Sequence, residues 1–135
     1  MGIFDFLKPS KNIKNDNGLN EFYYDKGKGN LRLRFHKKNG KIDGLFEIYT
    51  INGITAFLIA NFKDGKLHGE CKEWSSAGGC FRRIEKWKNG ELKSWESFFT
   101  ASKRGQVANK WEGNAATSYL KEDIEEELKK YSIKN

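Results

Sequence analysis

The sequence feature that most constrains the fold is a recurring pair of turn residues, Asn or Asp followed by Gly. The pairs of this kind between residues 17 and 90 include Asn17-Gly18, Asn39-Gly40, Asn52-Gly53, Asp64-Gly65 and Asn89-Gly90. These residues tolerate the positive φ angles of a type I′ turn, the tight turn that joins two antiparallel strands. The pairs therefore predict a chain built as a succession of β-hairpins.

The spacing of these residues indicates an internal repeat of 25 residues. The interval separates three sets of residues: Gly40, Gly65 and Gly90; Ile42, Leu67 and Leu92; and Tyr49, Trp74 and Phe99. An upstream copy fits at an offset of 26, where Gly18 mirrors Gly44, and a degraded last copy includes Gly105 and Trp111. The sequence therefore predicts an array of about four units, each a pair of strands.

Alternation of apolar and polar residues between the turns predicts eight strands. They are expected near residues 19–24, 31–36, 45–50, 54–62, 69–74, 80–87, 94–99 and 106–111. Residues 54–62 are apolar on both faces, which predicts that this strand is covered on both sides. Two segments are candidates for the cover or for capping the array. One is a helix expected from about residue 115 to 131, and the other is an apolar patch of Ile3, Phe4, Phe6 and Leu7.

The predicted fold is mainly β, an open antiparallel meander of about four repeated β-hairpins with a C-terminal α-helix. Its expected parts are an apolar and basic leader (1–16), the hairpin array (17–113) and the helix packed on or capping the array (114–135). A closed eight-stranded barrel holding a small ligand is the alternative architecture. The regular 25-residue period and the scarcity of Val favour the open array.

The charge of the chain is unevenly distributed. The formal net charge is +7, and residues 8–41 carry the excess, with ten basic residues against three acidic ones. No apolar run approaches the roughly 20 residues that a membrane-spanning helix needs. The first residues lack the basic segment of a secretory signal, and two cysteines are too few to hold together a secreted scaffold of this size. We therefore expect a cytoplasmic protein, with attachment to the inner face of the membrane as the alternative location.

One stretch of the array resembles the bacterial variant of the MORN repeat. That motif has an aromatic residue, then Asn/Asp-Gly-Lys-Leu-x-Gly, then a strand that ends in Tyr or Trp. Here it is Phe62-Lys63-Asp64-Gly65-Lys66-Leu67-His68-Gly69, and the next copy has Ser94 where Gly is expected. The resemblance covers about residues 17–113 and implies a hairpin array used as an interaction surface, in a family with many antitoxin and immunity proteins. The Tyr-x-Gly-x-Trp signature of eukaryotic, phospholipid-associated members is absent.

The sequence offers no catalytic constellation, so we expect neither an enzyme nor a bound cofactor or metal. His36 and His68 are the two histidines, and His68 occupies a repeat position where the other copies have Asp43 and Lys93, which favours a solvated turn residue. A zinc site would have to gather both histidines and both cysteines across three hairpins. Cys71 and Cys80 are not expected to pair, because Cys80 should face Ser75 while Cys71 should face Ile84.

Two groups of residues are candidates for binding a partner protein. The basic group is Arg32, Arg34, Lys37, Lys38 and Lys41, and the aromatic group is Trp74, Trp87 and Trp95. A basic cluster at the first hairpin either protects a sheet edge or docks an acidic partner. The repeat-equivalent residues Tyr23, Tyr49, Trp74 and Phe99 should form a column that either stabilises the sheet or contacts a partner.

The leading functional hypothesis is a non-enzymatic protein-binding module, specifically a bacterial immunity or antitoxin-type protein that neutralises a toxin by direct contact. Because an inhibitor of a nuclease is expected to be acidic, the toxin should be acidic at the contact and not a nucleic-acid cutter. The alternative is a peripheral module that binds anionic lipid through the N-terminal apolar and basic segment. Nucleic acid is not expected as a partner, because the cations are confined to one segment without a recognisable motif. The sequence leaves open the partner's identity, the sheet face that it uses and the oligomeric state.

Overall fold

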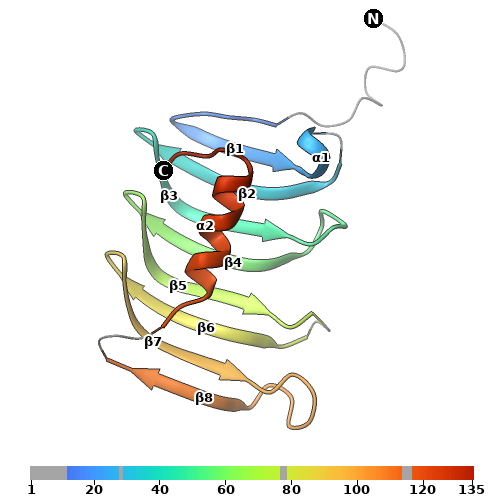
Figure 1. The fold of residues 1–135 in the computed structure, drawn as a ribbon, viewed down its shortest axis with the longest axis vertical. Coiled ribbons are helices and arrows are strands. Elements are labelled where there is room, and N and C mark those ends of the chain that lie inside the picture. The colour runs from blue at the N-terminus through green and yellow to red at the C-terminus, as the bar shows by residue number, and fades with distance from the viewer. Residues whose placement is uncertain (1–11, 28, 77–78, 114–116) are drawn as a thin grey trace, which may run out of the picture.

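The structure, a computed structural model, describes residues 12–27, 29–76, 79–113 and 117–135. Its main element is one open antiparallel sheet with strand order β1-β2-β3-β4-β5-β6-β7-β8 (Figure 1). The strands are β1 (Gly18–Tyr23), β2 (Leu31–Lys38), β3 (Lys41–Tyr49), β4 (Ala56–Lys63), β5 (Lys66–Trp74), β6 (Phe81–Lys88), β7 (Glu91–Phe98) and β8 (Val107–Glu112). The helices are α1 (Tyr24–Gly27) and α2 (Leu120–Lys130). The predicted open meander with a C-terminal helix is confirmed, and β1 and β8 lie at opposite ends of the sheet instead of closing a barrel.

Of the five Asx-Gly pairs named above, three form the predicted two-residue turns. Both residues have positive φ in Asn39-Gly40 (52° and 78°), Asp64-Gly65 (50° and 82°) and Asn89-Gly90 (48° and 84°). The prediction is wrong for the other two pairs. Asn17-Gly18 leads into β1, and Asn52 lies in a longer loop, where its side-chain oxygen accepts hydrogen bonds from the backbone N–H groups of Ile54 and Thr55. An Asn side chain that caps its own loop in this way replaces the tight turn.

The tight turns at Gly40, Gly65 and Gly90 lie on one side of the sheet, which we call the turn edge. The second and third of these turns are bonded to the hairpins that precede them. Gly65 N–H donates to the Ile42 carbonyl and Gly90 N–H to the Leu67 carbonyl, both at 2.8 Å. A side chain of the preceding unit also accepts from each turn: Asp43 from the N–H of Asp64 at 3.0 Å, and His68 Nδ1 from the N–H of Asn89 at 3.1 Å. His68, predicted to be a solvated turn residue, is half-buried beside this turn and accepts a backbone hydrogen bond from it.

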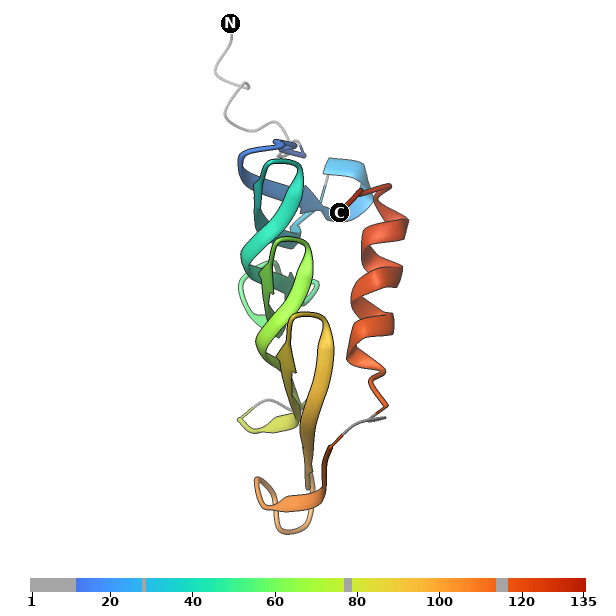
Figure 2. The same ribbon diagram turned by 90° about the vertical axis from the view of Figure 1, so that its left-hand side faces the viewer.

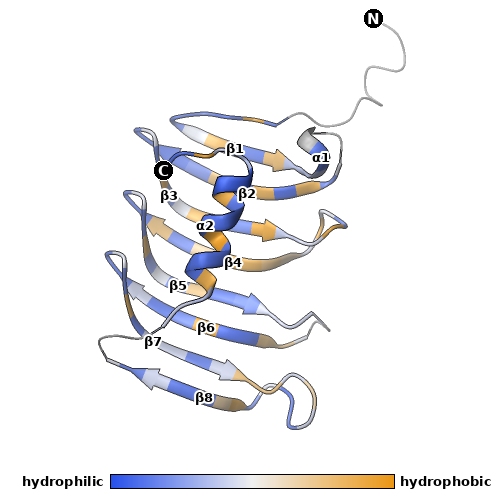
Figure 3. Cartoon of the chain, in the orientation of Figure 1, coloured by the Kyte–Doolittle hydropathy of each residue, from blue (hydrophilic) through white to orange (hydrophobic). Residues whose placement is uncertain are grey.

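The hydrophobic core lies between the sheet and α2, which crosses one face of the sheet (Figures 1 and 2). Aromatic rings on neighbouring strands stack in this core, with ring centroids 5.9 Å apart for Phe22 and Phe35 and 5.5 Å for Phe35 and Phe46. The helix adds its periodic apolar residues Leu120, Ile124 and Leu128, all buried. Figure 3 shows this amphipathic pattern of α2, in which apolar positions alternate with hydrophilic ones.

A β-bulge recurs near the start of β2, β4, β6 and β8. In β4 it bears on the prediction that this strand is covered on both faces. The register passes from Phe22↔Leu33 to Tyr23↔Leu31, which leaves Arg32 as an extra residue, and Phe57, Arg82 and Ala108 are extra in the same way. A bulge places the side chain of the extra residue on the same face of the sheet as the side chain of the next residue in the strand. Phe57 therefore packs against the same core as Leu58, beneath α2. The bulge thus accounts for one apolar residue of 54–62, Phe57, and the described residues place a helix over only one face of this strand, so the expected cover on both sides is not found among them.

Candidate functional site

The face of the sheet opposite α2 has no described helix over it (Figure 2), and we call it the open face. Two rows of side chains lie along it. The register gives one row, largely charged, as Glu21, Arg34, Glu47, Ile59, Lys72, Ile84, Glu96 and Lys110. The other row, largely aromatic and apolar, consists of four cross-strand pairs: Tyr23↔Leu31, Tyr49↔Ala56, Trp74↔Phe81 and Phe98↔Val107.

The aromatic row is continuous over β5, β6 and β7. The rings of Trp74 and Phe81 are 4.8 Å apart, those of Phe81 and Phe98 are 6.4 Å apart, and all three side chains are half-buried. The prediction that Phe99 completes the column is wrong by one residue. The bulge in β7 holds one extra residue, whereas those in β3 and β5 hold two. Phe98 consequently takes the place in the row, and Phe99 is 41% exposed beyond the strand.

The charged row alternates in sign, so its charges compensate one another. Arg34 forms an ion pair of 2.9 Å with Glu21, and its guanidinium lies 5.8 Å from the centroid of the Tyr49 ring. The Tyr49 hydroxyl donates to Glu47 at 2.9 Å. Burial, followed by this bond to Glu47, raises the pKa of Tyr49 above its ordinary value, so the phenol stays protonated and can donate. The acidic members Glu21, Glu47 and Glu96 balance the basic members Arg34, Lys72 and Lys110, so the open face is not a basic patch.

The other basic candidates are divided between the core and the first turn. Arg32 is directed to α2, where it binds Glu127 at 2.6 Å and the Tyr49 carbonyl at 2.9 Å. Burial acts to raise the pKa of Glu127, but the bonds and charge of Arg32, with help from Lys130, outweigh it and hold this pKa below its usual range. Arg32 therefore links the sheet to α2 and is not a surface cation. Lys38 and Lys41 are exposed and Lys37 is half-buried, all flanking the first tight turn.

Trp87 and Trp95, two of the three tryptophan candidates, lie on the α2 side and contact a buried polar network. At its centre is Glu85, fully buried, which accepts bonds from Arg83 at 2.7 Å, from the Trp87 indole at 3.1 Å and from the Ser118 hydroxyl at 2.7 Å. The Arg83 guanidinium stacks between the rings of Trp95 and Tyr119, 4.3 Å and 4.4 Å from their centroids. Trp87 is only 7% exposed. Trp74 is thus the tryptophan candidate that lies on the open face.

The cysteines and histidines do not come together. Cys71 and Cys80 are both free, as predicted, although Cys71 pairs in the sheet with Glu85 instead of the predicted Ile84. Burial, reinforced by the Glu85 and Glu73 carboxylates, raises the pKa of the Cys71 thiol far above its ordinary value, which keeps it protonated and unreactive. Among the residues that the structure describes, no group of three or more metal-ligating side chains forms.

The sequence prediction missed several members of the open face, notably Phe81, Glu47 and Lys72. The pattern Phe81-Arg82-Arg83-Ile84 hides the alternation, because the bulge at Arg82 shifts it by one residue. The leader residues Ile3, Phe4, Phe6 and Leu7 lie outside the described residues.

Comparison with known proteins does not identify a family for this chain. No protein-family model matches the chain, and no curated protein matches its sequence. Within the described ranges, no helix has both the length and the apolar character to cross a bilayer.

Proposed function

We propose that this protein is a non-enzymatic protein-binding module that contacts its partner with the open face of the sheet. The observation that carries the proposal is the contrast between the two faces. The α2 face is closed by packing, by the Arg32–Glu127 pair and by the Glu85 network. The open face has half-buried Trp74, Phe81 and Phe98, and aromatic residues of this kind are common anchors of protein interfaces.

The charges on the open face specify the kind of partner. Three acidic and three basic side chains alternate along the charged row, so a complementary partner has mixed charge and fixes its register through these groups. The exposed Lys38 and Lys41, which flank the first tight turn, add positive charge beside the open face. The resemblance of the repeats to bacterial MORN-like arrays supports the narrower proposal of an immunity or antitoxin-type protein. In that role, the open face would cover the active site of a toxin.

Co-purification with the product of the adjacent gene tests this function. We expect a stable complex and rescue of a host from the toxicity of that product. The double substitution Trp74→Ser/Phe81→Ser should weaken the complex at least tenfold, as loss of an aromatic anchor does. The matched control, Glu122→Ala on the exposed side of α2, should leave affinity unchanged. A product that neither binds nor is neutralised would contradict the toxin hypothesis, and equal affinity of the double variant would place the interface elsewhere.

A second candidate function is binding to anionic lipid. The observation that favours it is the loop between β3 and β4, where Ile51 is 78% exposed and Ile54 is 81% exposed. Apolar side chains on a loop can enter the interface of a bilayer while nearby cations meet its head groups. Flotation with phosphatidylcholine vesicles, with and without phosphatidylserine, tests it. We expect binding that requires phosphatidylserine and that falls on deletion of residues 1–14 or on the change Ile51→Ser/Ile54→Ser. Equal behaviour with both vesicles would eliminate this function.

A further inference from the structure

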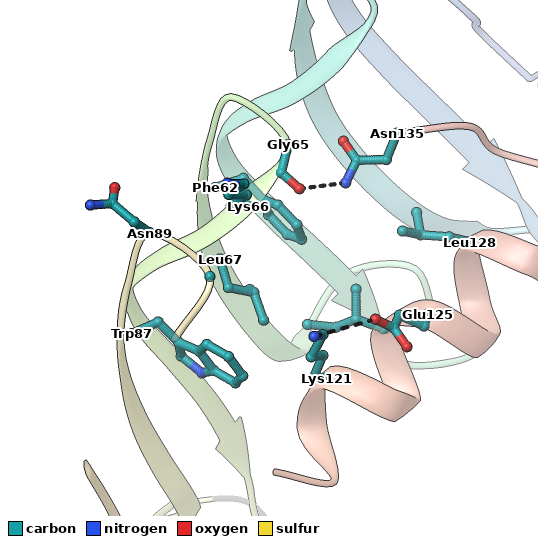
Figure 4. Close-up of a pocket in the computed structure, with 12 residues that line it drawn as sticks. Phe62, Gly65, Lys66, Leu67, Trp87, Asn89, Lys121, Glu125, Leu128 and Asn135 are labelled. Carbon is teal, nitrogen blue, oxygen red and sulfur yellow. Dashed lines mark hydrogen bonds and ion pairs between the residues drawn. The ribbon is translucent and has the colours of Figure 1, made fainter. Parts of the chain in front are cut away.

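The starting observation is how the side-chain amide of Asn135 binds to the turn edge. Its nitrogen donates to the Gly65 carbonyl at 2.7 Å (Figure 4). Its oxygen accepts from the Ile42 N–H at 2.8 Å. Gly65 and Ile42 are themselves joined, since Gly65 N–H donates to the Ile42 carbonyl. A primary carboxamide, with one donor and one acceptor side by side, therefore matches the backbone groups at this point of the repeat.

The repeat presents the same backbone groups again one unit later. Gly90 N–H donates to the Leu67 carbonyl at 2.8 Å, as Gly65 N–H does to Ile42. In a strand the N–H and carbonyl of one residue point to the same side, so the Leu67 N–H is directed toward this turn. The ladder between β5 and β6 begins only at Gly69↔Trp87, beyond Leu67. The Leu67 N–H and the Gly90 carbonyl are thus the equivalents of the two groups that bind Asn135.

A pocket of about 410 Å³ lies at this second position, between the turn edge and α2 (Figure 4). The sheet contributes the apolar side chains of Phe62, Leu67 and Trp87, and the helix contributes Ile124 and Leu128. The polar side chains that line it are Lys66, Asn89, Lys121 and Glu125, together with Asn135 itself. The pocket is therefore lined by apolar and polar side chains together, which suits a small ligand that has an apolar body and a polar group.

We propose that this pocket binds a primary carboxamide carried on an apolar or aromatic body. The amide oxygen would accept from the Leu67 N–H and the amide nitrogen would donate to the Gly90 carbonyl, while the body packs against Trp87 and Leu128. A carboxylate of the same shape places a negative oxygen against the Gly90 carbonyl and is disfavoured. The exposed Lys66 side chain, whose stem lies 3.5 Å from the position of a Cβ at Gly90, has to swing aside.

The experiment is an NMR titration of the full chain with benzamide, observed through backbone amides. We expect saturable binding with Kd in the millimolar range, as for other small fragments. The largest shifts should be at Leu67 N–H, Gly90 and Trp87. Two compounds with the same ring serve as controls: N,N-dimethylbenzamide, which lacks the donor, and benzoate. Each should bind at least tenfold more weakly. Equal affinity of N,N-dimethylbenzamide, or shifts that map away from these residues, would overturn the proposal.

A matched pair of tryptophan variants locates the site independently of the ligand series. Trp87→Leu removes the wall of the pocket and should weaken benzamide binding severalfold. Trp74→Leu alters the open face and should leave it unchanged. The comparison among ligands needs only the wild-type chain, so a Trp87→Leu variant that fails to fold still leaves the proposal open to refutation.

The carboxamide could belong to a side chain of a partner protein or to a free small molecule, and two further ligands distinguish these sources. N-acetyl-glutamine N-methylamide represents an Asn or Gln side chain of a partner protein, and benzamide represents a free aromatic amide. Tighter binding of the glutamine derivative identifies a peptide ligand, and tighter binding of benzamide identifies a small molecule. Failure of both to perturb the Leu67 N–H would refute the site. The outcome is independent of the open-face proposal, because the pocket lies on the α2 side of the sheet.

Discussion

At the scale of single residues, the most consequential side chain beneath α2 is Glu73. It is 8% exposed, and its Oε1 has no hydrogen-bond partner among the described residues, because the ion pair with Arg82 spans 3.6 Å. Burial, the largest effect, raises the pKa of this carboxyl. Arg82 acts to lower the pKa, whereas Asp123 raises it further. A carboxyl whose pKa is raised in the folded state binds its proton more tightly there than in the unfolded chain.

This environment predicts that Glu73→Gln stabilises the protein at neutral pH. Ionised Glu73 destabilises the fold as pH rises from the ordinary carboxyl pKa through the raised folded value, and Gln resembles the protonated form. We expect an increase of about 1 kcal/mol in the free energy of unfolding at pH 7, the usual scale for a buried polar atom left unpaired. The gain should vanish below the ordinary carboxyl pKa. Urea unfolding at several pH values measures it.

The control for this prediction is Glu127, whose carboxyl has the opposite shift. Its pKa is lowered in the fold, so its contribution to stability is present above the ordinary pKa and is lost as pH falls through the folded value. Glu127→Gln should therefore destabilise the protein at pH 7 and have less effect in acid. A Glu73→Gln variant that is less stable than wild type at pH 7 would contradict the account of its burial.

At the scale of elements, the hairpins are held in register by one acceptor side chain per unit. Asn17, Asp43 and His68 accept from the backbone N–H of Asn39, Asp64 and Asn89 respectively. Three different side chains fill the position because each places an acceptor atom at the same distance from its backbone. The requirement is for an acceptor, and not for a particular residue.

We therefore expect His68→Ala and His68→Asp to differ. Alanine removes the acceptor and should lower the free energy of unfolding by about 1 kcal/mol, the typical net value of such a bond. Aspartate, the residue used at the equivalent position 43, should retain most of the stability. Thermal unfolding and the hydrogen-exchange rate of the Asn89 N–H measure both variants. Equal behaviour of the two would show that the bond from His68 does not stabilise the turn.

At the scale of the whole molecule, α2 covers the sheet unevenly. Its beginning contacts β6 through Lys121 and Trp87, and the chain just beyond its end reaches β1 through Tyr131 and Phe22. β7 and β8 extend beyond the start of the helix (Figure 1). In β8, no residue is buried. The sheet therefore has a packed end and an end that depends mainly on its own hydrogen bonds.

This asymmetry predicts a gradient of local stability along the array. Amide exchange should be slowest in β2, β3 and β4, where the rings stack under α2, and at least tenfold faster in β8. Hydrogen exchange followed by NMR or mass spectrometry measures the gradient. Ile124→Ala, which leaves a cavity under α2, should accelerate exchange in β4 and β5 more than in β8. Uniform protection across all strands would contradict this picture.

Residues close together in the sequence were enough to predict the order of the elements and the antiparallel meander, whereas the structure shows that the sheet is open. Asx-Gly pairs at a constant interval permit only short antiparallel connections, and a 3.6-residue apolar period predicts one helix after them. Local chemistry is sufficient for these features, because turn conformation and periodicity depend on residues that are close in the chain.

The tertiary structure alone decided which candidate residues are buried and which remain on the surface. Arg32 and Trp87 looked like surface residues, but one lies at a bulge facing α2 and the other under that helix. Phe98 replaced Phe99 in the aromatic row because one bulge is shorter than its counterparts. A bulge of one extra residue reverses the face of every later residue in its strand relative to simple alternation, and its presence is set by pairing with a neighbouring strand. The composition of the open face therefore depends on contacts between distant residues, which a 25-residue period does not encode.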